Sequence, residues 1–301
     1  MRYGVIINSE SGSGFFKDAE RQERLKRIFT DSGHEADIRI VAPTDLNRTM
    51  REMASSQNDA LLIGGGDGTI TSAAKLLQGT GKVLGVIPLG TFNLEARDLN
   101  IDLDPFEAVR QLLESEVTEI DLLSVNDECC LCATVIGFYP ALAGSREDFH
   151  GRSWWTKAVR IVREVATVAV NSPALDLEIS VKGKTIRRRT RLAAFSPGRY
   201  VESIGLIPDR EDLASGLLSA YVSEHLSRAQ MLRAAFGFLA GRLFGTDELT
   251  HIESTEITIN VRRKRMIPAM IDGEILNIEM PCRLRILPRA LKVLRPAKQE
   301  P

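Results

Sequence analysis

The first 120 residues alternate between two patterns of apolar spacing. Short continuous apolar runs are typical of buried strands, and segments with an apolar residue every three or four positions are typical of helices. The predicted strands are residues 3–7, 35–41, 60–63 and 83–87, and the predicted helices include residues 18–29, 44–54 and 105–113. Thr44 is expected to cap the second of these helices. The alternation predicts an α/β domain with a doubly wound parallel sheet over residues 1–120.

After this region the pattern changes to consecutive strand-like runs. They cover residues 117–125, 129–138, 175–181, 185–195, 216–223, 252–261, 265–271 and 284–287, with helical spacing at 154–170 and 227–244. Successive strands joined by short turns favour antiparallel pairing, so residues 121–290 predict a mostly antiparallel β-sandwich domain. The last apolar run, 291–294, makes residues 291–301 a candidate return to the first domain.

Composition narrows the class of protein. A length of 301 residues suits two domains, and a net charge of −1 gives no global basic field, so nucleic acid is not an expected partner. No apolar stretch approaches the ~20 residues of a membrane-spanning helix. The cysteines at 129, 130, 132 and 282 lack metal-site or disulfide spacing, and three fall in one strand-like run, where alternation would point Cys130 and Cys132 to the same face. We expect buried thiols in a cytoplasmic protein, soluble or peripheral to a membrane, and leave a homodimer open.

One stretch carries most of the chemistry. The apolar residues 60–63 run directly into Gly64-Gly65-Gly66-Asp67-Gly68-Thr69, after which the spacing becomes helical. Glycine permits a tight turn and a close approach of a ligand to the backbone, and a helix N-terminus binds anions. A carboxylate such as Asp67 beside phosphates usually implies a metal ion. The spacing is not the G-x-G-x-x-G of a dehydrogenase.

Two further polar turns follow predicted strands. They are residues 8–14 and the segment Gly90-Thr91-Phe92-Asn93. Ligands of parallel sheets bind beyond the carboxyl ends of the strands. We therefore expect these turns and the glycine turn to meet at one edge of the sheet.

Three motifs in this order carry a resemblance. They are the glycine turn with Asp67, the Gly90–Asn93 turn about twenty residues later, and Asp272-Gly273-Glu274 near the C-terminus. The chain resembles the diacylglycerol kinase catalytic-domain family, and within it the bacterial lipid kinases, over essentially its whole length. That family includes sphingosine kinases and is related to NAD kinases.

The resemblance implies an α/β nucleotide domain, a β-sandwich domain, ATP in the cleft between them, and transfer of the γ-phosphoryl group to a lipid hydroxyl. Asp67 would act through Mg²⁺, and Asp272 or Glu274 would be the base that takes the hydroxyl proton. The residues implied to bind the nucleotide are Asn8, Ser11, Gly12, Gly64, Gly65, Gly66, Asp67, Gly68, Thr69, Thr71, Gly90, Thr91 and Asn93.

The Asp272-Gly273 pair supports two interpretations. Phosphoryl transfer depends on positioning and charge neutralisation, and a positioned base adds ~10²–10⁴ in rate. Asp-Gly is also a favoured pair for a type I′ hairpin turn. The residues alone favour the turn, the resemblance favours the base, and the two are compatible.

Several positions depart from the family's pattern. Leu94 stands where many members have an acidic residue, with Glu95 following. Ser215 stands at a position that in some members is a metal-binding Asp, and Asp209 and Asp212 are poor replacements. A nucleotide-binding threonine that many members have after the second strand is replaced here by Ile40 or Val41, and residues 195–200 stand where members often have an Asn-rich turn.

Two basic runs lie on predicted strands of the second domain, at 187–191 and 262–265. Each alone is best explained as a solvated sheet face or a protected sheet edge. Together they indicate a peripheral contact with an anionic membrane.

The resemblance and the departures from it leave three functions open. The first is an ATP-dependent lipid kinase, with a diacylglycerol-like lipid as the acceptor. The second is a kinase of a soluble metabolite, similar to the NAD kinases, and the third is a nucleotide-binding regulatory protein without catalysis. The lipid itself is not specified by the sequence.

Overall fold

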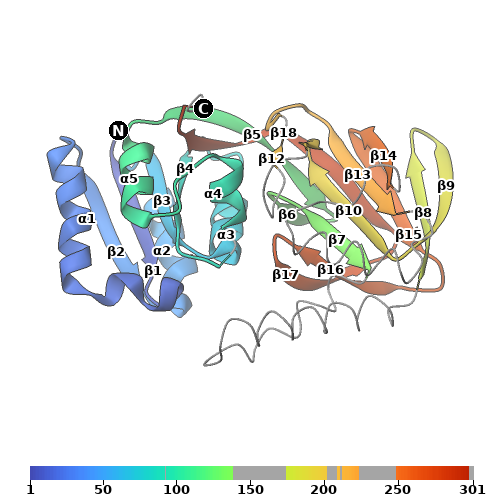
Figure 1. Cartoon of the computed structure of the whole chain (residues 1–301), viewed down its shortest axis with the longest axis horizontal. Helices are drawn as coiled ribbons and strands as arrows, with labels where there is room; N and C mark the ends of the chain where they lie inside the picture. Colours follow the sequence, from blue (N-terminus) through green and yellow to red (C-terminus); the bar gives the residue numbers. More distant parts are fainter. Residues whose placement is uncertain (92, 138–173, 202–208, 211, 224–248, 298–301) are drawn as a thin grey trace, which may run out of the picture. The chain divides into compact units, whose positions relative to one another are not determined.

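The computed structural model of the protein describes residues 1–91, 93–137, 174–201, 209–210, 212–223 and 249–297 (Figure 1). The chain forms two compact units: unit 1 is Met1–Leu122 with Pro288–Pro301, and unit 2 is Leu123–Leu287. Strands β5 (Glu116–Val125) and β18 (Cys282–Arg295) each begin in one unit and end in the other. The helices expected at 154–170 and 227–244 lie outside the described residues. Within the described ranges, no helix has the length and apolar content needed to cross a membrane.

Unit 1 contains a parallel sheet in the order β2, β1, β3, β4, β18. Its first four strands are β1 (Tyr3–Asn8), β2 (Ala36–Val41), β3 (Ala60–Gly65) and β4 (Val83–Pro88), and its helices are α1 (Ala19–Asp31), α2 (Leu46–Ala54), α3 (Asp67–Leu77), α4 (Leu94–Asp98) and α5 (Pro105–Leu113). All residues of β3 and β4 are buried, as expected for a parallel sheet that is covered on both faces. The predicted α/β unit with its parallel sheet is confirmed.

Polar residues fix where the helices of unit 1 begin. The Asp18 carboxylate accepts hydrogen bonds from the N–H groups of Glu20 and Arg21 at the start of α1. Asp104 caps α5 in the same way, with Pro105 in the first turn, where its missing N–H costs nothing. The prediction that Thr44 caps α2 is wrong: Thr44 lies inside the 3₁₀ turn Pro43–Asp45, and Asp45 directly precedes α2 without a side-chain cap.

Unit 2 contains antiparallel sheets. One holds β8 (Leu175–Val181), β9 (Lys184–Thr190), β15 (Glu256–Val261) and the first half of β18, while β6 (Glu128–Cys130) pairs with β5. The other has the order β14 (Leu249–Ser254), β13 (Leu218–Ser223), β10 (Leu192–Pro197), β7 (Thr134–Gly137), β16 (Met266–Ile271), β17 (Glu274–Glu279). A small pair, β11 (Tyr200–Val201) and β12 (Asp209–Arg210), stands apart. The predicted antiparallel sandwich is confirmed.

Three predicted runs prove to be two strands each. Residues 129–138 break after β6, residues 185–195 break at Arg191, and residues 252–261 break at Thr255. In all three cases the chain leaves one sheet and enters the other. The apolar pattern continues through each break because the inner faces of both sheets contribute to the same core. Sequence periodicity therefore could not reveal these corners.

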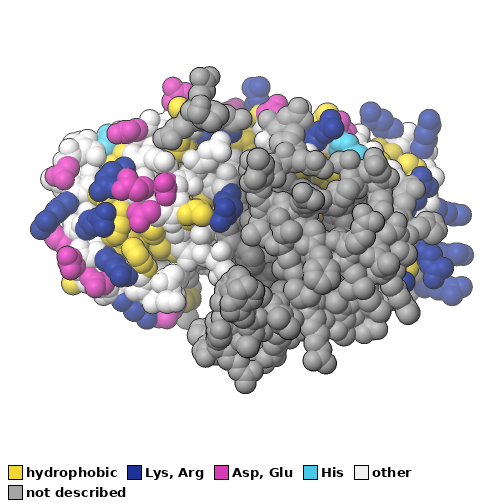
Figure 2. Space-filling model, in the orientation of Figure 1, with side chains coloured by type: hydrophobic (Ala, Val, Ile, Leu, Met, Phe, Trp, Pro, Cys, Tyr) yellow, Lys and Arg dark blue, Asp and Glu magenta, His cyan; other side chains and the backbone are white. Residues whose placement is uncertain are grey.

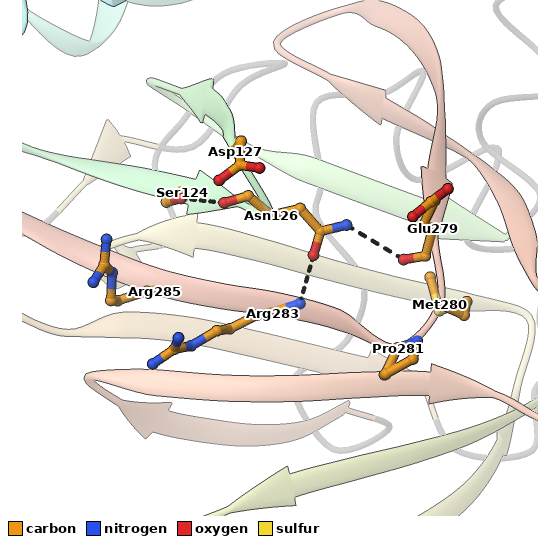
Figure 3. Close-up of a pocket in the computed structure, with 8 residues that line it drawn as sticks. All are labelled: Ser124, Asn126, Asp127, Glu279, Met280, Pro281, Arg283 and Arg285. Carbon is orange, nitrogen blue, oxygen red and sulfur yellow. Dashed lines mark hydrogen bonds between the residues drawn. The ribbon is translucent and has the colours of Figure 1, made fainter.

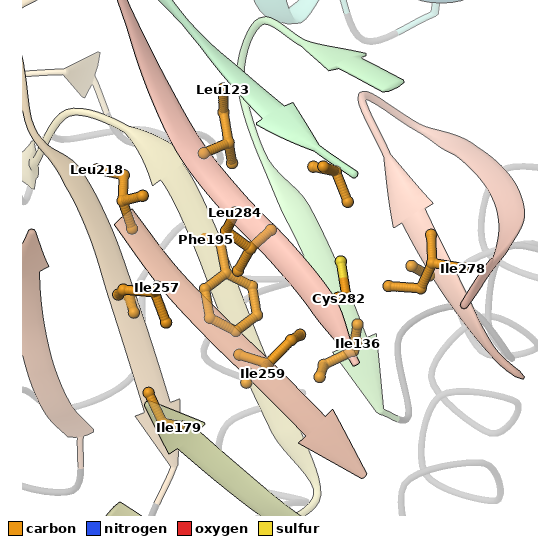
Figure 4. Close-up of a cluster of buried hydrophobic side chains, with 14 of the residues drawn as sticks. Leu123, Ile136, Ile179, Phe195, Leu218, Ile257, Ile259, Ile278, Cys282 and Leu284 are labelled. Carbon is orange, nitrogen blue, oxygen red and sulfur yellow. The ribbon is translucent and has the colours of Figure 1, made fainter. Parts of the chain in front are cut away.

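The core of unit 2 lies between these two sheets (Figure 4). Phe195 from β10 is fully buried, among residues that include Ile257 and Ile259 from β15 and Leu284 from β18. The four cysteines are free thiols and all are buried, as the sequence predicted. Cys132, however, lies beyond the end of β6, so strand alternation does not relate its direction to that of Cys130.

Candidate functional site

Three loops of unit 1 meet at the carboxyl ends of its strands. The first loop follows β1, the second is the glycine turn after β3, and the third follows β4 and contains Gly90 and Asn93. A Cβ atom placed on Gly90 would lie 2.8 Å from the Cα atom of Gly66, so the second and third loops touch through their backbones. A Cβ atom on Gly12 would lie 3.6 Å from the carbonyl oxygen of Leu89, which brings the first loop beside the third. Gly12 also has φ of +58°, which favours glycine. The expected convergence of the loops is present.

Asp67 ties the glycine turn to the third loop. It opens α3, and its Oδ1 atom accepts a hydrogen bond of 2.7 Å from the N–H group of Leu94. An ionised carboxylate has about four acceptor positions, so this bond is compatible with a further role as a metal ligand. Asp67 is half-buried, at the point where the first N–H groups of α3 lack intrahelical partners.

Asn93 closes the third loop. Its Oδ1 atom accepts from the Gly90 N–H group at 2.7 Å, and its Nδ2 group donates to the Gly90 carbonyl at 3.0 Å. Asn93 has φ of +51°, a left-handed conformation that asparagine tolerates better than most residues. The loop is therefore held in shape by its own side chain, and Thr91 at its tip is exposed.

The other residues expected to bind nucleotide lie on the same loops. Asn8 ends β1 and accepts from the Glu10 N–H group at 3.0 Å. Ser11 and Gly12 form the following 3₁₀ turn. The remaining residues expected to bind nucleotide belong to the glycine turn and lie at the end of β3 and in the first turns of α3: Gly64, Gly65, Gly66, Gly68, Thr69 and Thr71.

The chemical groups of this loop cluster are suited to binding a phosphate group and a metal ion. Glycines at 66 and 90 leave the backbone uncovered, and a side chain at 90 would fill the space between the loops. Helix N–H groups complement anionic oxygens, and Asp67 adds an oxygen ligand of the kind that Mg²⁺ prefers.

The hairpin tip between β16 and β17 contains the acidic motif of unit 2. Ile271 pairs with Glu274, so Asp272 and Gly273 form a two-residue turn, with φ of +46° and +90°. Positive φ at both positions is typical of a type I′ turn, so the turn expected from the Asp-Gly pair is present.

Asp272 is buried at the tip, with 1% of its surface exposed. Its carboxylate accepts backbone hydrogen bonds from Leu131 at 2.7 Å, Cys132 at 2.8 Å and Ala133 at 3.1 Å. The thiol of Cys130 lies 3.3 Å from the same carboxylate. Asp272 thus fastens the hairpin to the loop between β6 and β7.

Burial raises the pKa of the Asp272 carboxyl, while the three backbone N–H groups oppose this shift. All these partners are donors, so the geometry suits an ionised carboxylate. Burial also raises the pKa of the Cys130 thiol well above its usual range, and the nearby Asp272 charge adds to the effect. Cys130 therefore acts as a neutral donor.

Glu274 differs from Asp272 in its exposure. It is exposed at the start of β17, whereas the oxygens of Asp272 face inward to the 131–133 backbone. A base must reach the proton it removes. Of the two carboxylates expected to be candidate bases, Glu274 has the access that this role needs, and Asp272 has the contacts of an anchor.

The sequence did not reveal the partners of Asp272. The loop at 131–133 lies about 140 positions earlier in the chain, and its N–H groups carry no side-chain signal. Its far side is held by Tyr200, whose hydroxyl donates to the Cys132 carbonyl at 2.9 Å. Backbone donors of this kind become visible only in three dimensions.

The positions that depart from the family's pattern have local roles. Glu95 is buried in the first turn of α4, next to Leu94. Asp212 accepts from the Ala214 N–H group at 2.8 Å, and Ser215 contacts Leu217. In the part of the chain that the structure describes, no three His, Cys, Asp or Glu side chains form a group able to hold a metal ion.

A polar hollow of about 440 Å³ lies at the other end of β17 (Figure 3). Asn126 spans it, accepting from the Arg283 N–H group at 2.9 Å and donating to the Glu279 carbonyl at 3.3 Å. Arg283 also pairs with Glu256 at 2.7 Å. Because these groups bind one another and Glu279 lies at the end of β17 opposite Glu274, we assign the hollow no part in the site.

Comparison with known proteins gives two family matches. Residues 2–125 match the diacylglycerol kinase catalytic domain, and residues 152–295 match the YegS C-terminal NAD kinase beta sandwich-like domain.

Relatives and solved structures agree with these matches. A Staphylococcus epidermidis protein named "Putative lipid kinase SERP0390" is 30% identical over 260 residues, covering 82% of this chain and 80% of the relative. A protein named diacylglycerol kinase from Mycobacterium tuberculosis is 26% identical over 263 residues, with 84% and 82% covered. The crystal structure of a diacylglycerol kinase from Bacillus anthracis has a TM-score of 0.70 at 19% identity, covers 98% of this chain and 96% of its own, and shows the shared fold. The chain therefore belongs to the diacylglycerol kinase catalytic-domain family.

Proposed function

We propose that this protein is an ATP-dependent lipid kinase that transfers the γ-phosphoryl group to the hydroxyl of a diacylglycerol-like lipid. Its family supports phosphoryl transfer. The observation that carries the proposal is the backbone contact between the loops of Gly66 and Gly90, with Asp67 at the start of α3. A side-chain-free surface beside a helix N-terminus and a carboxylate suits a triphosphate with its metal ion.

The residues of unit 1 bind and orient the nucleotide in this proposal. Backbone N–H groups of the glycine turn would donate to phosphate oxygens, and Asp67 would hold Mg²⁺. Bound Mg²⁺ would neutralise charge on the phosphates. Asn93 keeps the third loop in shape, so that Gly90 and Thr91 can face the nucleotide.

The residues of unit 2 serve the acceptor. Glu274 would take the proton from the lipid hydroxyl as the hydroxyl oxygen attacks the γ-phosphorus. The bond between the γ-phosphorus and the β–γ bridging oxygen breaks, ADP leaves with that oxygen, and the exposed Glu274 carboxyl group then gives the proton to water. Asp272 does not take this proton, because its oxygens already accept from the 131–133 backbone. It holds the turn from which Glu274 projects.

The proposal is tested by incubating the full chain with γ-labelled ATP, Mg²⁺ and a total lipid extract, followed by mass analysis of labelled products. We expect label in a phosphorylated lipid, and its loss with Asp67→Ala. Label in a soluble metabolite such as a dinucleotide, or nucleotide binding without any transfer, would overturn the lipid kinase assignment.

A further inference from the structure

The turn between β15 and β16 is strongly cationic. Arg262, Arg263, Lys264 and Arg265 follow one another in it, and all four are exposed. The turn is well defined by its backbone, since the Lys264 N–H group bonds the Val261 carbonyl at 3.1 Å. Because four positively charged side chains lie next to one another in this short turn, its surface has a high density of positive charge.

A second basic run lies beside this turn. The Arg262 N–H group donates to the carbonyl of Asp176 at 3.0 Å, and Asp176 is the register partner of Arg189 on β9. Arg187, two residues earlier, is neutralised by Glu178 at 2.9 Å. Figure 2 shows Lys and Arg side chains gathered over the part of unit 2 that Figure 1 draws as β9. The two basic runs are far apart in the sequence, but both lie next to Asp176 in the fold.

An apolar strip begins where the cationic turn ends. We define the hairpin strip as Met266, Pro268, Met270 and Ile275, which share one face of β16 and β17 because Met270 pairs with Ile275. Met266 is 52% exposed and Ile275 is 42% exposed. β17 is the last strand of its sheet among the described residues, and the polar side chains of Asn277 and Glu279 lie opposite Pro268 and Met266 on the same face. Met266 and Ile275 therefore leave apolar surface exposed on this face of the hairpin.

We propose that the cationic turn and the hairpin strip together form the surface by which this protein docks on an anionic lipid bilayer. Lys and Arg would lie among the lipid phosphates while Met266 enters the boundary with the acyl chains. A basic cluster next to exposed apolar side chains is the arrangement that binds anionic bilayer surfaces. This inference rests on the proposed lipid kinase function and names the surface that would bring it to its substrate.

The surface leads to the hairpin that carries the proposed base. The strip runs from Met266 at the cationic turn to Ile275, the neighbour of Glu274. Met270, the register partner of Ile275, lies four residue steps along β16 from Met266, which is about 13 Å at the usual rise of a strand. A lipid surface that contacts the strip would therefore reach the hairpin that carries Glu274.

Flotation with vesicles tests the inference without requiring catalysis. The full chain should bind vesicles of phosphatidylglycerol and phosphatidylcholine, bind phosphatidylcholine alone far less, and be released by high salt. Arg262→Glu combined with Lys264→Glu should lower the partition coefficient about tenfold or more. Met266→Ser should lower it about threefold.

Matched variants exclude a general charge or surface effect. Lys182→Asp with Lys184→Glu makes the same charge change at the exposed tip of the β8–β9 hairpin, and should change binding by less than about twofold. Val117→Ser removes an equally apolar side chain, 41% exposed in β5, and should have no effect. Equal losses in the control pair and the turn pair would overturn the proposal.

Other occupants give different results. The lipid assignment would be contradicted if the protein did not bind anionic vesicles but bound duplex DNA through the cationic turn. It would also be contradicted if the protein formed a dimer that Met266→Ser dissociates. Phosphorylation of a short-chain, water-soluble diacylglycerol separates the two proposals. If the short-chain diacylglycerol is not phosphorylated but the protein still binds vesicles, only the kinase function is overturned. Full activity of the turn variant on vesicles would overturn the docking surface only.

Discussion

The two Asp-Gly pairs of this chain, one in each unit, have opposite surroundings. Asp67-Gly68 opens α3 in unit 1, and the half-buried Asp67 carboxylate accepts from Leu94 at the edge of an open loop cluster. Asp272-Gly273 closes a hairpin in unit 2, and its carboxylate is buried under the N–H groups of Leu131, Cys132 and Ala133. The same dipeptide thus has a half-buried carboxylate beside a loop cluster in one unit and a fully buried carboxylate that anchors a hairpin in the other.

This contrast bears on which acidic residues act chemically. Backbone N–H groups that occupy the acceptor positions of a carboxylate stabilise its ionised form. Protonation of that carboxylate would break these hydrogen bonds and destabilise the fold around it. A carboxylate at an accessible position is available for a metal ion or a proton. Our account therefore assigns chemistry to Asp67 and Glu274 and structure to Asp272.

The largest effect is expected at Asp67. Asp67→Ala should lower turnover about a thousandfold or more, because a metal ligand and its charge are lost. Asp67→Asn keeps an oxygen that can accept from Leu94 and removes only the charge. Steady-state kinetics should find both variants inactive, and thermal unfolding should be unchanged for Asp67→Asn, which keeps the bond from Leu94. An active Asp67→Asn variant would show that Asp67 matters only for the loop.

The next effect is on stability, at Asp272. Asp272→Asn should lower the free energy of unfolding by about 2–3 kcal/mol, because an amide replaces an ionised acceptor that faces several donors. Urea denaturation measures this. Glu279→Gln, on the exposed far end of the same hairpin, should change it by less than about 0.5 kcal/mol. Similar values for the two variants would contradict the anchor role.

A smaller effect separates the two glycines that touch in unit 1. Gly90→Ala forces a Cβ atom to 2.8 Å from the Cα of Gly66 and should destabilise the protein by about 1–3 kcal/mol. Gly66→Ala places its Cβ 3.6 Å from Gly90, an ordinary contact, so stability should hold while ATP binding weakens. Calorimetric unfolding and nucleotide titration distinguish these outcomes, and equal stability of the two variants would refute the loop contact.

A pH-dependent effect concerns the buried thiol of Cys282 in unit 2. Burial raises the pKa of Cys282 from 9.0 to about 11. The unfolded thiol ionises first, so the native state holds more protons between these values and its stability falls as pH rises. The fall should be steeper in the native protein than in Cys282→Ala by up to about 1.4 kcal/mol per pH unit. Identical slopes in denaturation series over this range would contradict the burial effect.

The sequence predicted unit 1 better than unit 2, for a physical reason. In unit 1 the loops carry their own chemistry: Gly66, Gly90 and Asn93 set their backbone locally, and parallel strands bring the loops to one edge. In unit 2 the corner at Arg191 and the partners of Asp272 depend on pairings between distant segments. Periodicity could not mark them, because both sheets contribute to one core and backbone N–H groups are the same in every residue.

The family resemblance supplied the candidates, and geometry distinguished between them. Both Asp272 and Glu274 were candidate bases from the motif alone. The hydrogen bonds to Leu131, Cys132 and Ala133 now favour Glu274.

The role of Glu274 as the base is best tested by the turnover of Glu274→Gln with ATP and diacylglycerol in mixed micelles. We expect turnover to fall by about 10²–10⁴ with unchanged unfolding, because the base is removed while the anchored turn remains. A Glu274→Gln variant that retains the turnover and pH–rate profile of the native protein would contradict it.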